Sequence, residues 1–104
     1  AQAAAARSGL LCPIVGHVGD GNFHALVLYD AADASERMRA EEFVETVARA
    51  AIAHGGTCTG EHGIGLHKLG MLAIEHGEAV SVMRAIKDAL DPQGIMNPGK
   101  TVPY

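Results

Sequence analysis

The sequence has 104 residues, of which 48% are hydrophobic and 19% are charged, and its formal net charge is −4. This length suits one small domain with a single core. The apolar fraction argues against a disordered chain, and the balance of 12 acidic to 8 basic residues argues against a nucleic-acid-binding protein. Its uncharged apolar runs stay well below the ~20 residues that a membrane-spanning helix needs.

The cysteines and the N-terminal residues bear on the compartment. Cys12 and Cys58 are too few for a disulfide framework and do not form the paired spacing of a zinc ribbon. Residues 1–7 lack the basic start and the apolar segment of a signal peptide, so a reducing, cytoplasmic location is expected. They also lack an initial Met and read as the end of a helix, which suggests a piece of a longer chain.

The first predicted elements are two strands. Residues 10–18 and 23–29 are short apolar runs with the length and composition of β-strands. Asp20-Gly21, between them, is a strong turn signal. The sequence therefore predicts an antiparallel hairpin with Asp20-Gly21 as a two-residue loop.

Helices are predicted after the hairpin. Apolar residues recur at helical spacing over residues 35–54, with Ser35 as the predicted N-cap and Gly55-Gly56 as the end. Two further helices are predicted over about 67–76 and 78–90. The last helix is expected to turn four apolar side chains inward: Val80, Met83, Ile86 and Leu90.

A glycine-rich segment interrupts the helices. Three glycines among the six residues 60–65, Gly-Glu-His-Gly-Ile-Gly, predict a shaped loop, and residues 57–59 before it suit a short strand. Together the elements predict a single α+β domain over residues 1–104, with helices packed on one side of an antiparallel sheet.

The hairpin would bring two histidines together. With Asp20-Gly21 as the loop, His17 lies directly opposite His24, and opposite residues share a face with Cβ atoms roughly 5 Å apart. Two imidazoles at that distance can bind one divalent metal. The alternative is a pair of ordinary hairpin histidines, one exposed to solvent and one hydrogen-bonded.

The glycine loop supplies further candidates. Glu61 adds a carboxylate and His62 a third imidazole, and two His with one Glu form a common ligand set for zinc and similar metals. A plain solvated loop is the alternative, and spacing alone leaves both interpretations open. The other histidines suggest a helix end at His54 and surface positions for His67 and His76.

Three segments occur in order: GHVGDGNFH over residues 16–24, GEHGIG over 60–65 and DPQGIMNPGK over 91–100. Together they resemble the C-terminal domain of the FAD-linked oxidases of the vanillyl-alcohol-oxidase type. The similarity is greatest to the group of D-lactate dehydrogenase (cytochrome) and the glycolate oxidase FAD subunit. It covers the chain from about residue 9 and implies the ferredoxin-like cap portion of that domain. The chain would then be a C-terminal fragment without its N-terminal FAD-binding domain, and inactive alone.

The resemblance implies an FAD enzyme that oxidises a D-2-hydroxy acid to a 2-oxo acid. In metal-dependent members, the positions matching His17, His24 and Glu61 hold a divalent ion, Zn or Mn. The position matching His62 is the general base, and Asn97 is a candidate for a contact with FAD, with a tight turn as its alternative.

The resemblance also implies partners. These are the FAD-binding domain of the same polypeptide, a small 2-hydroxy acid and an electron acceptor such as a cytochrome or quinone. A homo-oligomer and a place peripheral to the inner membrane fit as well. Relatives that oxidise 2-hydroxyglutarate carry Asn where this chain has Leu26, so a small or apolar substrate is expected rather than a dicarboxylate.

Two alternatives come from other functional classes. One is a non-catalytic module that binds metal or self-associates through an apolar face left exposed without a flavin domain. The other is an independent metallohydrolase that would use His17, His24 and Glu61 as ligands and His62 as the base.

Overall fold

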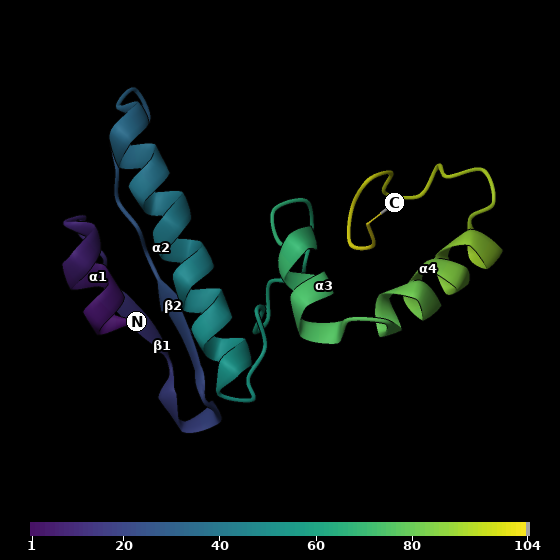
Figure 1. Cartoon of the computed structure of the whole chain (residues 1–104), viewed down its shortest axis with the longest axis horizontal. Helices are drawn as coiled ribbons and strands as arrows, with labels where there is room; N and C mark the ends of the chain where they lie inside the picture. The colour runs from purple at the N-terminus through teal and green to yellow at the C-terminus, as the bar shows by residue number, and fades with distance from the viewer. Residues whose placement is uncertain (104) are drawn as a thin grey trace.

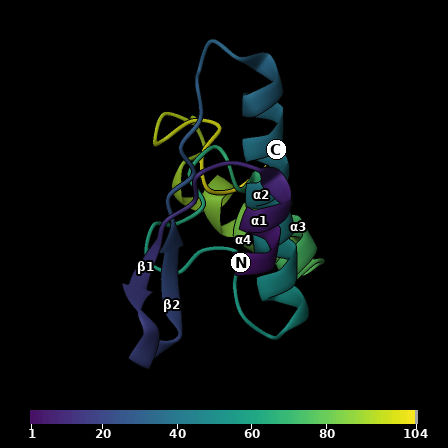
Figure 2. The same cartoon turned by 90° about the vertical axis from the view of Figure 1, so that its left-hand side faces the viewer.

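The computed structural model describes residues 1–103 and has an α+β fold, as predicted (Figure 1). A two-stranded antiparallel sheet is accompanied by four helices and one short 3-10 helix. In chain order the elements are α1 (Gln2–Ser8), β1 (Ile14–His17), η1 (Val18–Asp20), β2 (Asn22–Ala25), α2 (Ala34–Ala53), α3 (Leu69–His76) and α4 (Ala79–Leu90). Helices α1 and α2 lie on one side of the hairpin (Figure 2). Among residues 1–103, no helix combines the length and apolar character needed to cross a bilayer.

The hairpin forms, but the predicted register is wrong. The pairing runs from Ile14 opposite Ala25 to His17 opposite Asn22, so His24 faces Val15 rather than His17. The turn is longer than predicted because η1 takes Val18–Asp20 into a 3-10 turn and Gly21 completes it at φ 72°. Side chains alternate between the faces of a sheet with a period of two, so this two-residue shift keeps both histidines on one face.

Helix α2 is the longest element and carries most of the small core. Its N-cap is Asp33 rather than Ser35, since the Asp33 carboxylate accepts hydrogen bonds from the backbone N–H groups of Ser35 and Glu36. Its buried residues are Ala40, Phe43 and Ala48. The predicted end at the glycine pair is confirmed, with Gly55 at φ 77°.

The last two helices form with nearly the predicted bounds, while residues 57–59 form no strand. The predicted inward face of α4 is wrong at its C-terminal half, where Ile86 is 55% and Leu90 75% exposed. The reason is visible in Figure 1, in which α4 extends away from the layer formed by α1 and α2.

Asp91 organises the chain after α4. Its buried carboxylate accepts hydrogen bonds from the backbone N–H groups of Ile95 and Met96 and from the Lys87 ammonium. The bond from Lys87, together with the two backbone bonds, holds the pKa of the Asp91 carboxyl below its usual range. Further along, the backbone N–H of Thr101 donates to the Gly65 carbonyl over 2.8 Å, so the tail returns to the glycine loop.

The described chain is open rather than compact. Its accessible surface is 7138 Å², against about 5,500 Å² for a compact protein of 10.8 kDa. Its radius of gyration is 15.7 Å, against about 13 Å for a compact chain of this length. Several large apolar side chains of the hairpin and α4 are therefore exposed, including Val15, Leu28, Val82 and Leu90.

The narrow strand separation at Gly16 gives the first prediction. A Cβ at Gly16 would lie 2.5 Å from the Phe23 Cα and 2.6 Å from the Asn22 carbonyl oxygen, and these backbone atoms cannot move without opening the hairpin. We expect Gly16→Ala to lower the free energy of unfolding by about 1–3 kcal/mol, measured by urea denaturation. Gly19→Ala is the matched control, because a Cβ there meets nothing within 4 Å. Equal stability of the two variants would contradict this account of the hairpin.

Asp91 gives a second prediction, on pH dependence. A lowered carboxyl pKa stabilises the fold above the unfolded-state value of about 4, and this contribution is lost as the pH falls through the folded-state value. Asp91→Asn should therefore lower the urea midpoint at pH 7, and its difference from wild type should shrink below about pH 4. A difference that stays constant across this range would mean that the Asp91 charge does not stabilise the turn.

Candidate metal centre

Two of the predicted ligands stand on the same face of the hairpin. His17 ends β1 and His24 lies within β2, in the diagonal positions that the observed register creates. Their ring centroids are 6.2 Å apart and the rings meet edge to face, at 82°. Diagonal neighbours in a sheet remain within reach of long side chains, so the shifted register still brings both imidazoles to one place.

Glu61 completes the group from a distant part of the sequence. Its Oε1 lies 3.0 Å from Nε2 of His24, and one ligand atom each from His17, His24 and Glu61 lies within 4.8 Å of the other two. Two atoms bound to the same zinc ion can be at most about 4.2 Å apart, so a small side-chain rotation would close the set around an ion. The exposure of Glu61, 51% for its side chain, leaves room for that rotation. Two nitrogens and a carboxylate oxygen therefore suit a first-row divalent metal.

The glycine loop is held against the hairpin at Gly60. A Cβ at this position would lie 2.3 Å from Oδ1 of Asn22, the residue that pairs with His17 in the sheet. Because Gly60 has no side chain, the loop can approach closely enough for Glu61 to reach His24. Sequence analysis did not single out Asn22, although its place at the start of the second strand next to the turn was a usable signal.

The loop itself is irregular, as predicted, and is closed by a hydrogen bond. The Thr59 hydroxyl donates to the Gly63 carbonyl oxygen over 3.0 Å, spanning Glu61 and His62. Gly63 has a φ of 76°, in the left-handed region that favours glycine. This turn presents two neighbouring side chains, a carboxylate and an imidazole, at the same site.

His62 lies beside the three candidate ligands and is open to solvent. Its ring centroid is 5.1 Å from that of His24, and its Nε2 lies 3.7 Å from the Glu61 carboxylate. With a side chain that is 68% exposed, it can accept a proton from a molecule bound at the ligand group.

The remaining predicted site residue, Asn97, lies in the tail after α4. It is exposed and adopts a φ of 46°, uncommon for a residue other than glycine. The bond from Thr101 to Gly65 brings the end of this tail to the glycine loop. Its predicted contact with a cofactor remains a prediction.

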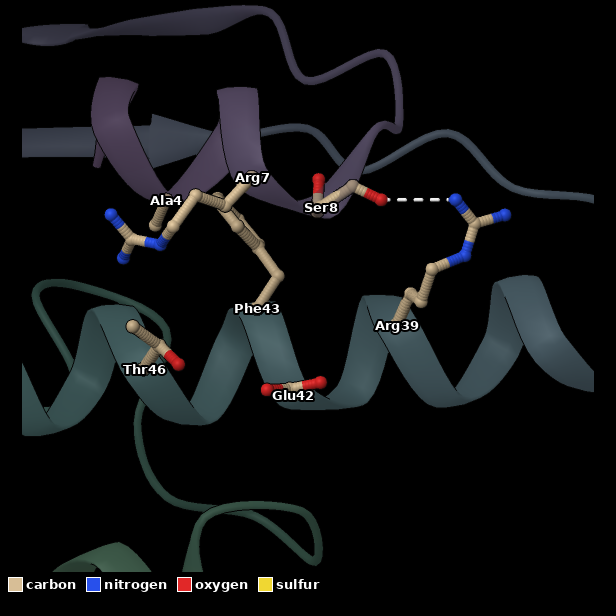
Figure 3. A pocket seen from close by; sticks show the side chains of 7 residues that line it. All are labelled: Ala4, Arg7, Ser8, Arg39, Glu42, Phe43 and Thr46. Carbon is tan, nitrogen blue, oxygen red and sulfur yellow. Dashed lines mark hydrogen bonds between the residues drawn. The ribbon is translucent and has the colours of Figure 1, made fainter.

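A separate groove lies between α1 and α2 (Figure 3). There the Arg39 guanidinium donates to the Ser8 carbonyl oxygen over 3.0 Å, at the end of α1. Phe43 fills the space between the two helices. None of the predicted site residues lines this groove, so its contacts explain how α1 is held on α2 rather than a binding function.

Comparisons with known proteins agree with the motifs. The family described as FAD linked oxidases, C-terminal domain, matches residues 1–101. A protein of Danio rerio named probable D-lactate dehydrogenase, mitochondrial, is 54% identical over 91 residues, 86% of this chain and 18% of that protein. The mitochondrial D-lactate dehydrogenase [cytochrome] of Arabidopsis thaliana is 45% identical over 97 residues, 92% of this chain and 17% of that protein.

A bacterial relative belongs to the glycolate oxidase group. Glycolate oxidase subunit GlcD of Escherichia coli strain K12 is 40% identical over 88 residues, 84% of this chain and 18% of that protein. The chain thus spans less than a fifth of the length of these curated relatives.

The contact at Gly60 gives a prediction about the candidate metal centre. Gly60→Ala would crowd the Asn22 side chain and lift the loop, and lifting the loop separates Glu61 from His24. We expect weaker Mn²⁺ binding, by about 10-fold, in a titration followed by electron paramagnetic resonance. Gly70→Ala in α3 is the control, since a Cβ there meets nothing within 4 Å. Equal affinity of both variants would show that the loop does not need its close approach.

Proposed function

Since the chain belongs to the FAD-linked oxidase family, as part of its C-terminal domain, we propose that it is the substrate- and metal-binding part of a flavoenzyme that oxidises a D-2-hydroxy acid to the 2-oxo acid. One observation carries this proposal. His17, His24 and Glu61, from two strands and a distant loop, offer ligand atoms within 4.8 Å of one another, with the imidazole of His62 next to them.

The ligand group supports binding of Zn²⁺ or Mn²⁺. The two imidazoles bind through neutral nitrogens, and the carboxylate of Glu61 supplies the negative charge. A bound ion would act as a Lewis acid toward the carboxylate and hydroxyl groups of the substrate. The partial exposure of His17 and Glu61 leaves the open side through which a substrate enters.

His62 is proposed as the general base. Oxidation of a 2-hydroxy acid removes the hydroxyl proton and, from the carbon, a hydride. The imidazole of His62 accepts the proton, and FAD, when bound, supplies the acceptor for the hydride. The exposed position of His62 lets it pass the proton on to solvent afterwards. In this proposal Asn97 contacts the FAD from the tail that reaches the glycine loop.

Leu26 supports a small or apolar substrate. It follows His24 by two residues and is 50% exposed, so it offers an apolar surface near the ligand group. A second substrate carboxylate placed there would gain no hydrogen-bond donor from this side chain. Lactate and glycolate, the substrates in the names of the relatives, lack such a group.

The FAD-binding part of the enzyme is proposed to lie in the same, longer polypeptide. The relatives are more than five times as long as the region matched here, and the open shape of the described chain leaves apolar faces that such a part could cover. An electron acceptor, a cytochrome or a quinone, would then reoxidise the flavin. A peripheral position at an inner membrane fits the mitochondrial names of several relatives.

Metal analysis and turnover of the complete polypeptide test the proposal together. We expect near-stoichiometric Zn or Mn in the wild type, and loss of both metal and D-lactate or glycolate oxidation in His17→Ala, His24→Ala and Glu61→Ala. His62→Gln should keep the metal and lose most of the turnover, because it removes the base but no ligand.

His54→Gln is the matched control, since this exposed histidine ends α2 and lies outside the ligand group. A wild-type flavoprotein that is active without metal would overturn the ligand assignment. Metal binding without FAD or oxidation would favour a non-catalytic metal-binding module.

A further inference from the structure

A glutamate on α3 reaches the glycine loop from outside the ligand group. Glu75 is nearly buried, with a side chain that is 12% exposed. Its Oε2 accepts hydrogen bonds from the backbone N–H of Cys58 over 2.8 Å and from the Thr57 hydroxyl over 3.1 Å. The start of the loop is thus fixed to a helix 17 residues further along the chain.

The connection continues around the loop through two threonines. The Thr57 hydroxyl accepts a hydrogen bond from the backbone N–H of Thr59 over 3.3 Å, and the Thr59 hydroxyl donates to the Gly63 carbonyl oxygen over 3.0 Å. The resulting chain runs from Glu75 to Gly63 and encloses Glu61 and His62.

The negative charge of Glu75 strengthens its hydrogen bonds with Thr57 and Cys58. The hydrogen bond from the Cys58 N–H, more than any other contact, lowers the pKa of the Glu75 carboxyl, so the group is ionised at neutral pH. Hydrogen bonds to an ionised carboxylate are roughly twice as strong as those between neutral groups. Burial, followed by the Glu75 carboxylate, raises the pKa of the Cys58 thiol.

The hydrogen bonds from Glu75 to Gly63 hold the backbone on both sides of Glu61 and can therefore orient its side chain. The loop already contacts the hairpin at Gly60, and the tail holds its other end through Gly65. Between these points, the side chain of Glu61 is 51% exposed, and its carboxylate meets His24 at 3.0 Å and His62 at 3.7 Å. The position of the loop backbone therefore determines whether this carboxylate can reach His24.

We propose that Glu75 is a positioning residue for the carboxylate of Glu61, acting through Thr57 and Thr59. The inference rests on the proposed function, because it assigns Glu75 a role toward the metal that Glu61 would bind. Outer partners that orient a ligand typically change metal affinity by about 10–100-fold when they are removed.

The test is a Mn²⁺ titration of the metal-free complete polypeptide, with free Mn²⁺ followed by electron paramagnetic resonance. We expect Glu75→Ala to weaken binding by about 10–100-fold. Glu75→Gln keeps an acceptor oxygen and should recover most of the affinity, whereas Glu75→Met fills a similar space without such an acceptor and should bind Mn²⁺ as weakly as Glu75→Ala. Glu41→Ala is the matched control, because Glu41 is an exposed helical glutamate that pairs only weakly with Arg37, at 3.9 Å.

A second variant keeps the test valid if Glu75→Ala does not fold. Thr59→Val keeps the shape of the side chain and removes the hydroxyl, and we expect it to weaken Mn²⁺ binding as well. Combined with Glu75→Ala in a folded protein, it should add less than its separate effect, since both changes break one chain of bonds.

The outcomes separate the two proposals. Wild-type affinity in Thr59→Val or in folded Glu75→Ala, with loss of Mn²⁺ in His24→Ala, would overturn the role of Glu75 and leave the metal centre intact. Failure of the wild type itself to bind Mn²⁺ or Zn²⁺ would overturn the metal centre, and with it this role.

Discussion

The close approach of the Gly60–Gly65 loop to the β1–β2 hairpin is the contact on which the site depends. The hairpin alone offers two imidazoles, which bind a divalent ion weakly without a third ligand. The absence of a side chain at Gly60 leaves room for Asn22, and the loop brings the Glu61 carboxylate to 3.0 Å from His24. Everything proposed about chemistry, including the place of His62 beside the ligands, follows from that contact.

The sequence predicted that His17 and His24 share one face of the hairpin, and they do, although the predicted register was wrong. His17 and His24 do not face each other, because η1 lengthens the turn, but a shift of two residues leaves the faces of a strand unchanged. Local signals also predicted the bounds of α2 closely and missed only which of two polar residues caps it, Asp33 or Ser35. Both side chains suit an N-cap, and the geometry of the preceding turn decides between them.

Contacts between distant segments could not be predicted in the same way. Glu75 is one acidic residue in a short helix, and nothing in its neighbours indicates that it accepts hydrogen bonds from residues 57 and 58. The periodicity of α4 predicted an inward face, yet Ile86 and Leu90 are exposed because periodicity shows which residues share a face and not whether anything covers it. The position of Asn97 could not be predicted either. It follows from the turn after α4, which the buried carboxylate of Asp91 holds through hydrogen bonds.

The metal centre can be tested by anomalous X-ray diffraction from crystals of the complete polypeptide grown with Zn²⁺. We expect one strong peak at the zinc edge within about 2.0–2.2 Å of a nitrogen of His17, a nitrogen of His24 and an oxygen of Glu61. Density for zinc elsewhere, with these three side chains bound only to each other or to solvent, would contradict this expectation.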